Sequence, residues 1–91
     1  MASIIANDVF RDIDNIAHSV APLPERRDKA ARRIDQFRVN VAAQRRRPEV
    51  AEILINDLRK KLEMAAMHRE TPGDRKSVFM EAFDRLTGFE G

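Results

Sequence analysis

The chain has 91 residues, of which 43% are hydrophobic and 35% charged, and its formal net charge is +2. This length predicts a single domain over residues 1–91 whose small core argues against a roomy buried active site. The chain contains no cysteine, which excludes disulfides and thiolate metal sites and favours a reducing, cytoplasmic location.

The positive charge is concentrated in one segment of the chain. Residues 1–24 carry one Arg against three Asp, residues 25–47 carry nine Lys and Arg against three acids, and residues 48–91 carry seven basic residues against nine acids. A basic segment of this kind indicates a negatively charged partner, either a nucleic acid or an acidic protein surface.

Four segments with apolar residues at helical spacing follow one another, separated by prolines. No stretch alternates polar and apolar residues long enough to predict a strand, and glycine is nearly absent. We therefore predict an all-α fold, a small antiparallel bundle of three to four helices over about residues 3–20, 24–46, 48–69 and 72–87. The short connection between the second and third helices predicts that these two are antiparallel neighbours.

The first predicted helix ends before Pro22 and Pro24, because proline cannot donate its N–H and restricts the preceding residue. The residues expected to face the core from this helix are Ile5, Val9, Ile13, Ile16 and Val20.

The second predicted helix combines an inner apolar stripe with a basic flank. The stripe consists of Ala30, Ile34, Phe37 and Val41. We expect the flank to meet the phosphates of a polyanion or an acidic protein surface. Its members are Arg26, Lys29, Arg33, Arg46 and Arg47.

The third predicted helix has more apolar residues than one inner stripe needs. Its inner residues are Ala51, Leu54, Leu58, Leu62 and Ala65. Other apolar side chains project from its remaining sides, although Asp57 and Lys60 interrupt them. We predict that these extra residues form a protein-docking surface, because a bundle this small has one interior. The predicted docking residues are Val50, Ile53, Met64 and Met67, together with Val39 on the second helix.

The fourth predicted helix follows Thr71, and either Thr71 or Asp74 serves as its N-cap. Its inner residues are Phe79, Ala82, Phe83 and Leu86.

Nothing in the sequence predicts catalysis. His18 and His68 have no neighbouring ligands at metal spacing and are expected to be ordinary surface histidines. The serines lack a nucleophile elbow, and three scattered glycines do not make a phosphate loop. We therefore expect neither an enzyme nor a cofactor or metal site. No apolar run reaches the roughly 20 residues that a membrane span requires.

These patterns predict a non-enzymatic interaction protein, an adaptor, assembly factor or inhibitor, that docks onto a protein partner through the third helix. The basic second helix would steer it towards an acidic partner surface. The alternative is a nucleic-acid-associated protein that contacts phosphates through the arginine-rich second helix. A homodimer is a third hypothesis.

Overall fold

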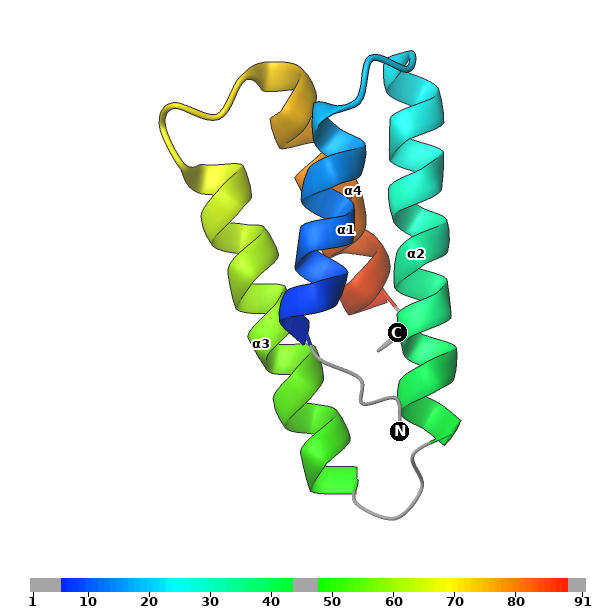
Figure 1. Cartoon of the computed structure of the whole chain (residues 1–91). Helices are drawn as coiled ribbons and strands as arrows, with labels where there is room; N and C mark the ends of the chain where they lie inside the picture. The colour runs from blue at the N-terminus through cyan, green and yellow to red at the C-terminus, as the bar shows by residue number, and fades with distance from the viewer. Residues whose placement is uncertain (1–5, 44–47, 89–91) are drawn as a thin grey trace.

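The computed structural model describes residues 6–43 and 48–88, and within these ranges it contains helices and no strand. The helices are α1 (Ala6–His18), α2 (Leu23–Ala43), α3 (Pro48–Met67) and α4 (Gly73–Gly88). They run alternately up and down the long axis of a body measuring 39 × 27 × 22 Å (Figure 1). The predicted all-α antiparallel bundle is confirmed.

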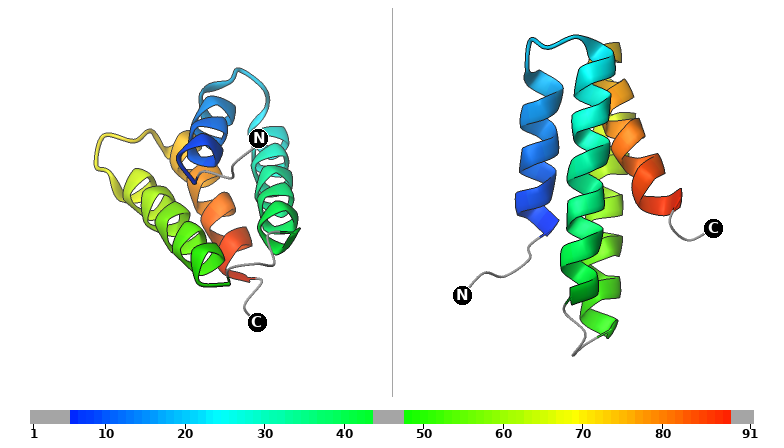
Figure 2. Two further views of the ribbon diagram at one scale, coloured as in Figure 1. Left: turned by 60° about the horizontal axis from the view of Figure 1, so that its bottom comes forward. Right: turned by 90° about the vertical axis from the view of Figure 1, so that its right-hand side faces the viewer.

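The four helices do not pack as a simple square. α1 and α4 contact each other, and each of them contacts both α2 and α3. α2 and α3 hardly touch and lie on opposite flanks of the α1–α4 pair (Figures 1 and 2). These two helices are antiparallel, as predicted, but the prediction that they are neighbours is wrong, because α1 and α4 lie between them. α3 therefore has partners on one side only.

The core follows the predicted stripes most closely in α2. Its buried apolar residues are Ala30, Ile34, Phe37 and Val41. α3 contributes Leu58, Leu62 and Ala66, and α4 contributes Val78, Phe79, Ala82 and Leu86. Burial of these side chains is the main force that holds helices of such mixed composition together.

The first helix differs from its prediction at the C-terminal end of its stripe. Its buried residues are Ala6, Val9, Ile13 and Ala17. Val20 is fully exposed, because α1 ends at His18 and the chain then turns towards α2. Ile5, predicted to start the stripe, lies outside the described residues.

The turn between α3 and α4 uses Thr71 differently from the prediction. The Thr71 hydroxyl donates a hydrogen bond to the carbonyl oxygen of Ala65 at 2.8 Å. It thereby satisfies an orphan acceptor in the last turn of α3 rather than capping α4, which begins at Gly73.

Candidate functional site

The outward side of α3 carries exposed apolar side chains, as the sequence predicted. Ile53, Met64 and Met67 are 64%, 73% and 71% exposed, and Val50 is 40% exposed. We call these four residues the outer face of α3. Their exposure is a fact of the structure, whereas their role in docking stays a prediction.

The packing of the bundle explains why this face is open. On the opposite side of α3, Leu58 and Leu62 are completely buried against the other helices. Because α3 packs against α1 and α4 and hardly touches α2, none of the other described helices covers its far side. An α-helix that buries one stripe leaves the opposite stripe to water, whatever residues occupy it.

Val39 does not belong to this surface. It is 68% exposed, but it lies on α2, on the other flank of the bundle (Figure 1). Val39 therefore does not continue the outer face of α3, because α2 and α3 hardly touch, and its role in docking stays a prediction.

Arg26 is buried, so the prediction that it lies on an exposed basic flank is wrong. Its side chain is only 10% exposed. Its guanidinium donates hydrogen bonds to the carbonyl oxygens of Ala21 at 2.7 Å and Ala17 at 3.0 Å. It also donates to the carboxylate of Asp74 at 2.9 Å. Arg26 thus satisfies a carbonyl at the end of α1 and ties α1 and α2 to the first turn of α4.

The other residues of the predicted basic flank do not share one environment. Arg33 pairs with Asp12 of α1 at 2.8 Å, with its side chain 28% exposed. Lys29 is exposed. Arg46 and Arg47 lie outside the described residues. Of the three predicted positions inside the described ranges, one is buried, one is paired and one is exposed, so these three do not form a row of free cations.

Other arginines at this side of the bundle also meet carboxylates of neighbouring segments. Arg27 pairs with Glu81 at 2.8 Å, and Arg85 donates two hydrogen bonds to Asp35, at 2.8 and 2.7 Å. Arg32 pairs with Asp28 one turn away on α2. Much of the positive charge of α2 is thus balanced within the chain.

Two of these carboxylates have a perturbed pKa. The hydrogen bond from Arg85 lowers the pKa of Asp35 below its ordinary value. The hydrogen bond from Arg26 likewise lowers the pKa of Asp74. The same pair with Asp35 raises the pKa of Arg85. These shifts fit ion pairs that join helices rather than an acid or base prepared for catalysis.

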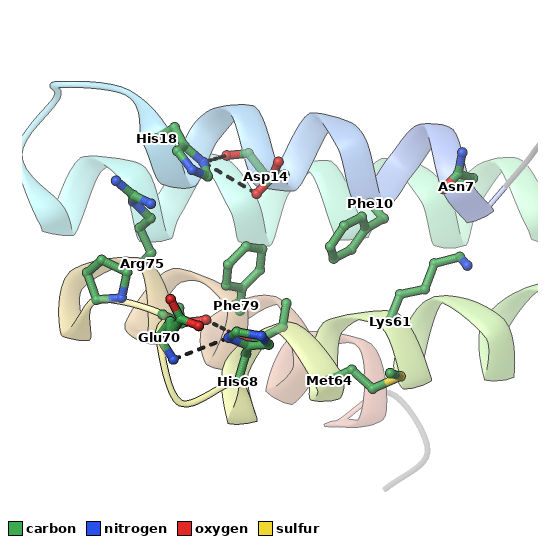
Figure 3. Close-up of a pocket in the computed structure, with 13 residues that line it drawn as sticks. Asn7, Phe10, Asp14, His18, Lys61, Met64, His68, Glu70, Arg75 and Phe79 are labelled. Carbon is green, nitrogen blue, oxygen red and sulfur yellow. Dashed lines mark hydrogen bonds and ion pairs between the residues drawn. The ribbon is translucent and has the colours of Figure 1, made fainter.

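An open groove of about 540 Å³ lies between α1 and the end of α3 (Figure 3). Phe10 of α1 and Phe79 of α4 stack in its floor, with ring centroids 5.9 Å apart. Met64 also lines it, so the groove adjoins the outer face of α3. An apolar floor beside exposed methionines extends the surface on which another molecule could lose its hydration.

Both histidines line this groove, and each has a local partner. His18 Nδ1 donates to the carbonyl oxygen of Asp14 at 2.8 Å. The backbone N–H of Glu70 donates to His68 Nδ1 at 3.2 Å. Across residues 6–43 and 48–88, no group of three His, Cys, Asp or Glu side chains is arranged to hold a metal ion. Both imidazoles are thus held by hydrogen bonds within their own segments of the chain.

Two features of the site were not predicted from the sequence. The groove depends on Phe10, whose displacement from the inner stripe of its helix was the one available indication. The burial of Arg26 had no comparable indication, because its partners lie five, nine and 48 residues away and none of them is at helical spacing on α2.

Comparisons of the chain with family models, with curated proteins and with solved structures each gave no match. None of the helices in the described part of the chain is both long and apolar enough to span a membrane.

Proposed function

We propose that this protein is a non-enzymatic interaction protein that binds another protein through the outer face of α3. The observation that carries the proposal is the 64–73% exposure of Ile53, Met64 and Met67 on a helix whose opposite side forms the core. Large apolar residues that gather on one exposed face mark docking sites, because burying them in an interface removes them from water. The methionines add flexible, polarizable side chains that adapt to a partner.

The basic second helix has a smaller part in this proposal than its composition suggests. Arg26 is buried and Arg33 is paired with Asp12, which leaves Lys29 as the exposed cation among the three positions described. Steering towards an acidic partner then depends on Lys29 and on residues outside the described ranges. The same argument weakens the alternative of nucleic-acid binding, in which each contacted phosphate needs a free cation. The cytoplasmic location stays a prediction from the missing cysteines.

The proposal is tested by affinity capture from the native host with the wild-type chain and two matched variants. Met64→Asp places a charge on the outer face of α3, whereas Val39→Asp places the same charge on the opposite flank at a similarly exposed site. We expect a captured protein to be lost with Met64→Asp and retained with Val39→Asp. Each capture is repeated after nuclease treatment.

Two results would contradict the proposal. Capture that persists with Met64→Asp would place the binding surface elsewhere. If capture by the wild-type chain is lost after nuclease treatment and also at high salt, the nucleic-acid hypothesis is favoured instead.

A further inference from the structure

Six of the exposed residues of α3 repeat with alternating spacings of three and four. Starting from Val50, the steps lead to Ile53, Asp57, Lys60, Met64 and Met67. All six side chains are exposed, so they form one continuous outward stripe along the helix. We call these six residues the α3 seam. A repeat of this kind is the pattern by which one helix packs lengthwise against another in a coiled coil.

Charged residues at the centre of an apolar seam are costly unless the partner helix neutralises them. Asp57 contacts Lys61 of its own helix at 3.5 Å, with half of its side chain exposed. Lys60 has no ion pair among the described residues. The seam thus presents one negative and one positive group, flanked on both sides by apolar pairs.

The seam matches a second copy of itself that runs in the opposite direction, because opposite charges and apolar residues then face each other. If two copies of the seam are laid antiparallel about a two-fold axis, Asp57 lies opposite Lys60 of the second copy, and Lys60 lies opposite its Asp57. Ile53 then meets Met64, and Val50 meets Met67. A parallel arrangement instead places Asp57 against Asp57 and Lys60 against Lys60, which repel each other.

From this complementarity we infer that the outer face of α3 binds a second copy of the same chain, as an antiparallel two-fold dimer along the α3 seam. The inference rests on the proposed function and names the partner. A two-fold dimer uses one surface twice, and a seam that matches its own reverse satisfies that condition. The central charges fix both the orientation and the register, as single polar residues do in other coiled coils.

The dimer is expected to be weak. The seam covers 18 residues, a length of about 26 Å at 1.5 Å per residue, and it offers four apolar side chains from each copy. Such an interface falls at the small end of specific interfaces, where association is transient. The molecule is therefore expected to change from monomer to dimer with concentration.

Sedimentation velocity over about a hundredfold range of concentration, reaching several hundred micromolar, tests the inference for a weak interface. We expect Asp57→Lys and Lys60→Asp each to weaken the dimer by about tenfold or more, because each variant creates two like-charge contacts. The double variant D57K/K60D restores opposite charges and should dimerise like the wild type. An equimolar mixture of the two single variants should form a heterodimer.

Matched controls come from the same helix. Glu52→Lys and Arg59→Asp make the same changes of charge at exposed positions outside the seam, and should leave dimerisation within about threefold of the wild type. All of these positions are exposed, so the variants are expected to fold, which circular dichroism verifies.

The orientation is tested by cross-linking, since the natural chain has no cysteine. In the antiparallel dimer, Ile53→Cys lies opposite Met64→Cys of the other copy, whereas two copies of Ile53→Cys are offset by 11 residues, or about 16 Å along the axis. A short bis-maleimide should therefore link a mixture of the two variants far more efficiently than either variant alone. Self-linking of Ile53→Cys would overturn the antiparallel arrangement.

Failure of this inference can be separated from failure of the proposed function. A wild-type chain that stays monomeric throughout the concentration range, but captures a host protein in a Met64-dependent manner, overturns the dimer and leaves the docking proposal intact. A dimer that survives both Ile53→Asp and Met64→Asp overturns the dimer along α3, whereas the docking proposal is decided separately by the capture experiment with Met64→Asp.

Discussion

The outward surfaces of α2 and α3 differ in how far the rest of the molecule uses them. Arginines along α2 reach across to α1 and α4, where Arg33 meets Asp12 and Arg27 meets Glu81. On the outer face of α3, by contrast, Ile53, Met64 and Met67 are left largely in water. The difference follows from reach and chemistry. A long guanidinium side chain can find a carboxylate on a neighbouring helix, whereas an apolar side chain on the far side of a helix is removed from water only by another molecule.

The largest expected effect is a difference in stability between a mutation on the buried side of α3 and a mutation on its exposed side. Leu62 is completely buried, and Leu62→Ala is expected to lower the free energy of unfolding by about 2–5 kcal/mol through lost burial and a cavity. Met64 is 73% exposed, and Met64→Ala is expected to change the free energy of unfolding by less than about 0.5 kcal/mol. Urea unfolding at a low protein concentration, which disfavours association, measures both values. Equal losses for the two variants would contradict the division of α3 into a core side and a free side.

The next effect concerns Arg26, the one arginine that α2 buries. Arg26→Met is expected to destabilise the fold by about 2 kcal/mol, because it leaves the buried carbonyl oxygen of Ala17 and the partly buried one of Ala21 without their donor. The matched control is Lys29→Met, since Lys29 is exposed, and it is expected to stay within about 0.5 kcal/mol of the wild type. The measurement is again urea unfolding. A loss no greater than that of the control would show that Arg26 contributes no more to stability than an exposed charged residue of α2.

The helices and most of the core were predictable because both depend on spacing along a single helix. The buried stripe of α2, from Ala30 to Val41, appears directly in the periodicity of its apolar residues. The exposure of Ile53, Met64 and Met67 was predictable for the same reason, since a residue opposite a buried stripe faces outward when no other helix covers it.

The features that were predicted wrongly depend on contacts between helices, and the spacing of residues along one helix does not determine those contacts. Arg26 lies on the same side of the wheel as Lys29, but only the turn after α1 and the position of Asp74 determine that it is buried. The separation of Val39 from the α3 surface likewise follows from the insertion of α1 and α4 between α2 and α3. A short connecting segment constrained the direction of these two helices and not their contact.

The smallest expected effect is a pH dependence of stability, which comes from the pair between Asp35 of α2 and Arg85 of α4. Arg85 lowers the pKa of Asp35 in the folded chain, whereas an Asp in the unfolded chain has a pKa of about 3.9. The pair therefore contributes its full stability above about pH 4 and loses it as the pH falls through the lower folded pKa. Because both side chains remain partly exposed, at 48% and 36%, solvent keeps this contribution small.

Asp35→Asn tests this dependence through the urea midpoint measured at a series of pH values. The difference between wild type and variant should be constant at neutral pH and shrink towards zero as the solution is acidified below about pH 4, where the wild-type carboxylate also becomes protonated. In an Arg85→Met background, Asp35→Asn should have no pH-dependent effect, because the group that lowers the pKa of Asp35 is gone. A difference that persists unchanged at low pH, or that survives in the Arg85→Met background, would show that Asp35 stabilises the fold by a route other than its pair with Arg85. The charged surface of α2 would then be less involved in holding the bundle together than its geometry indicates.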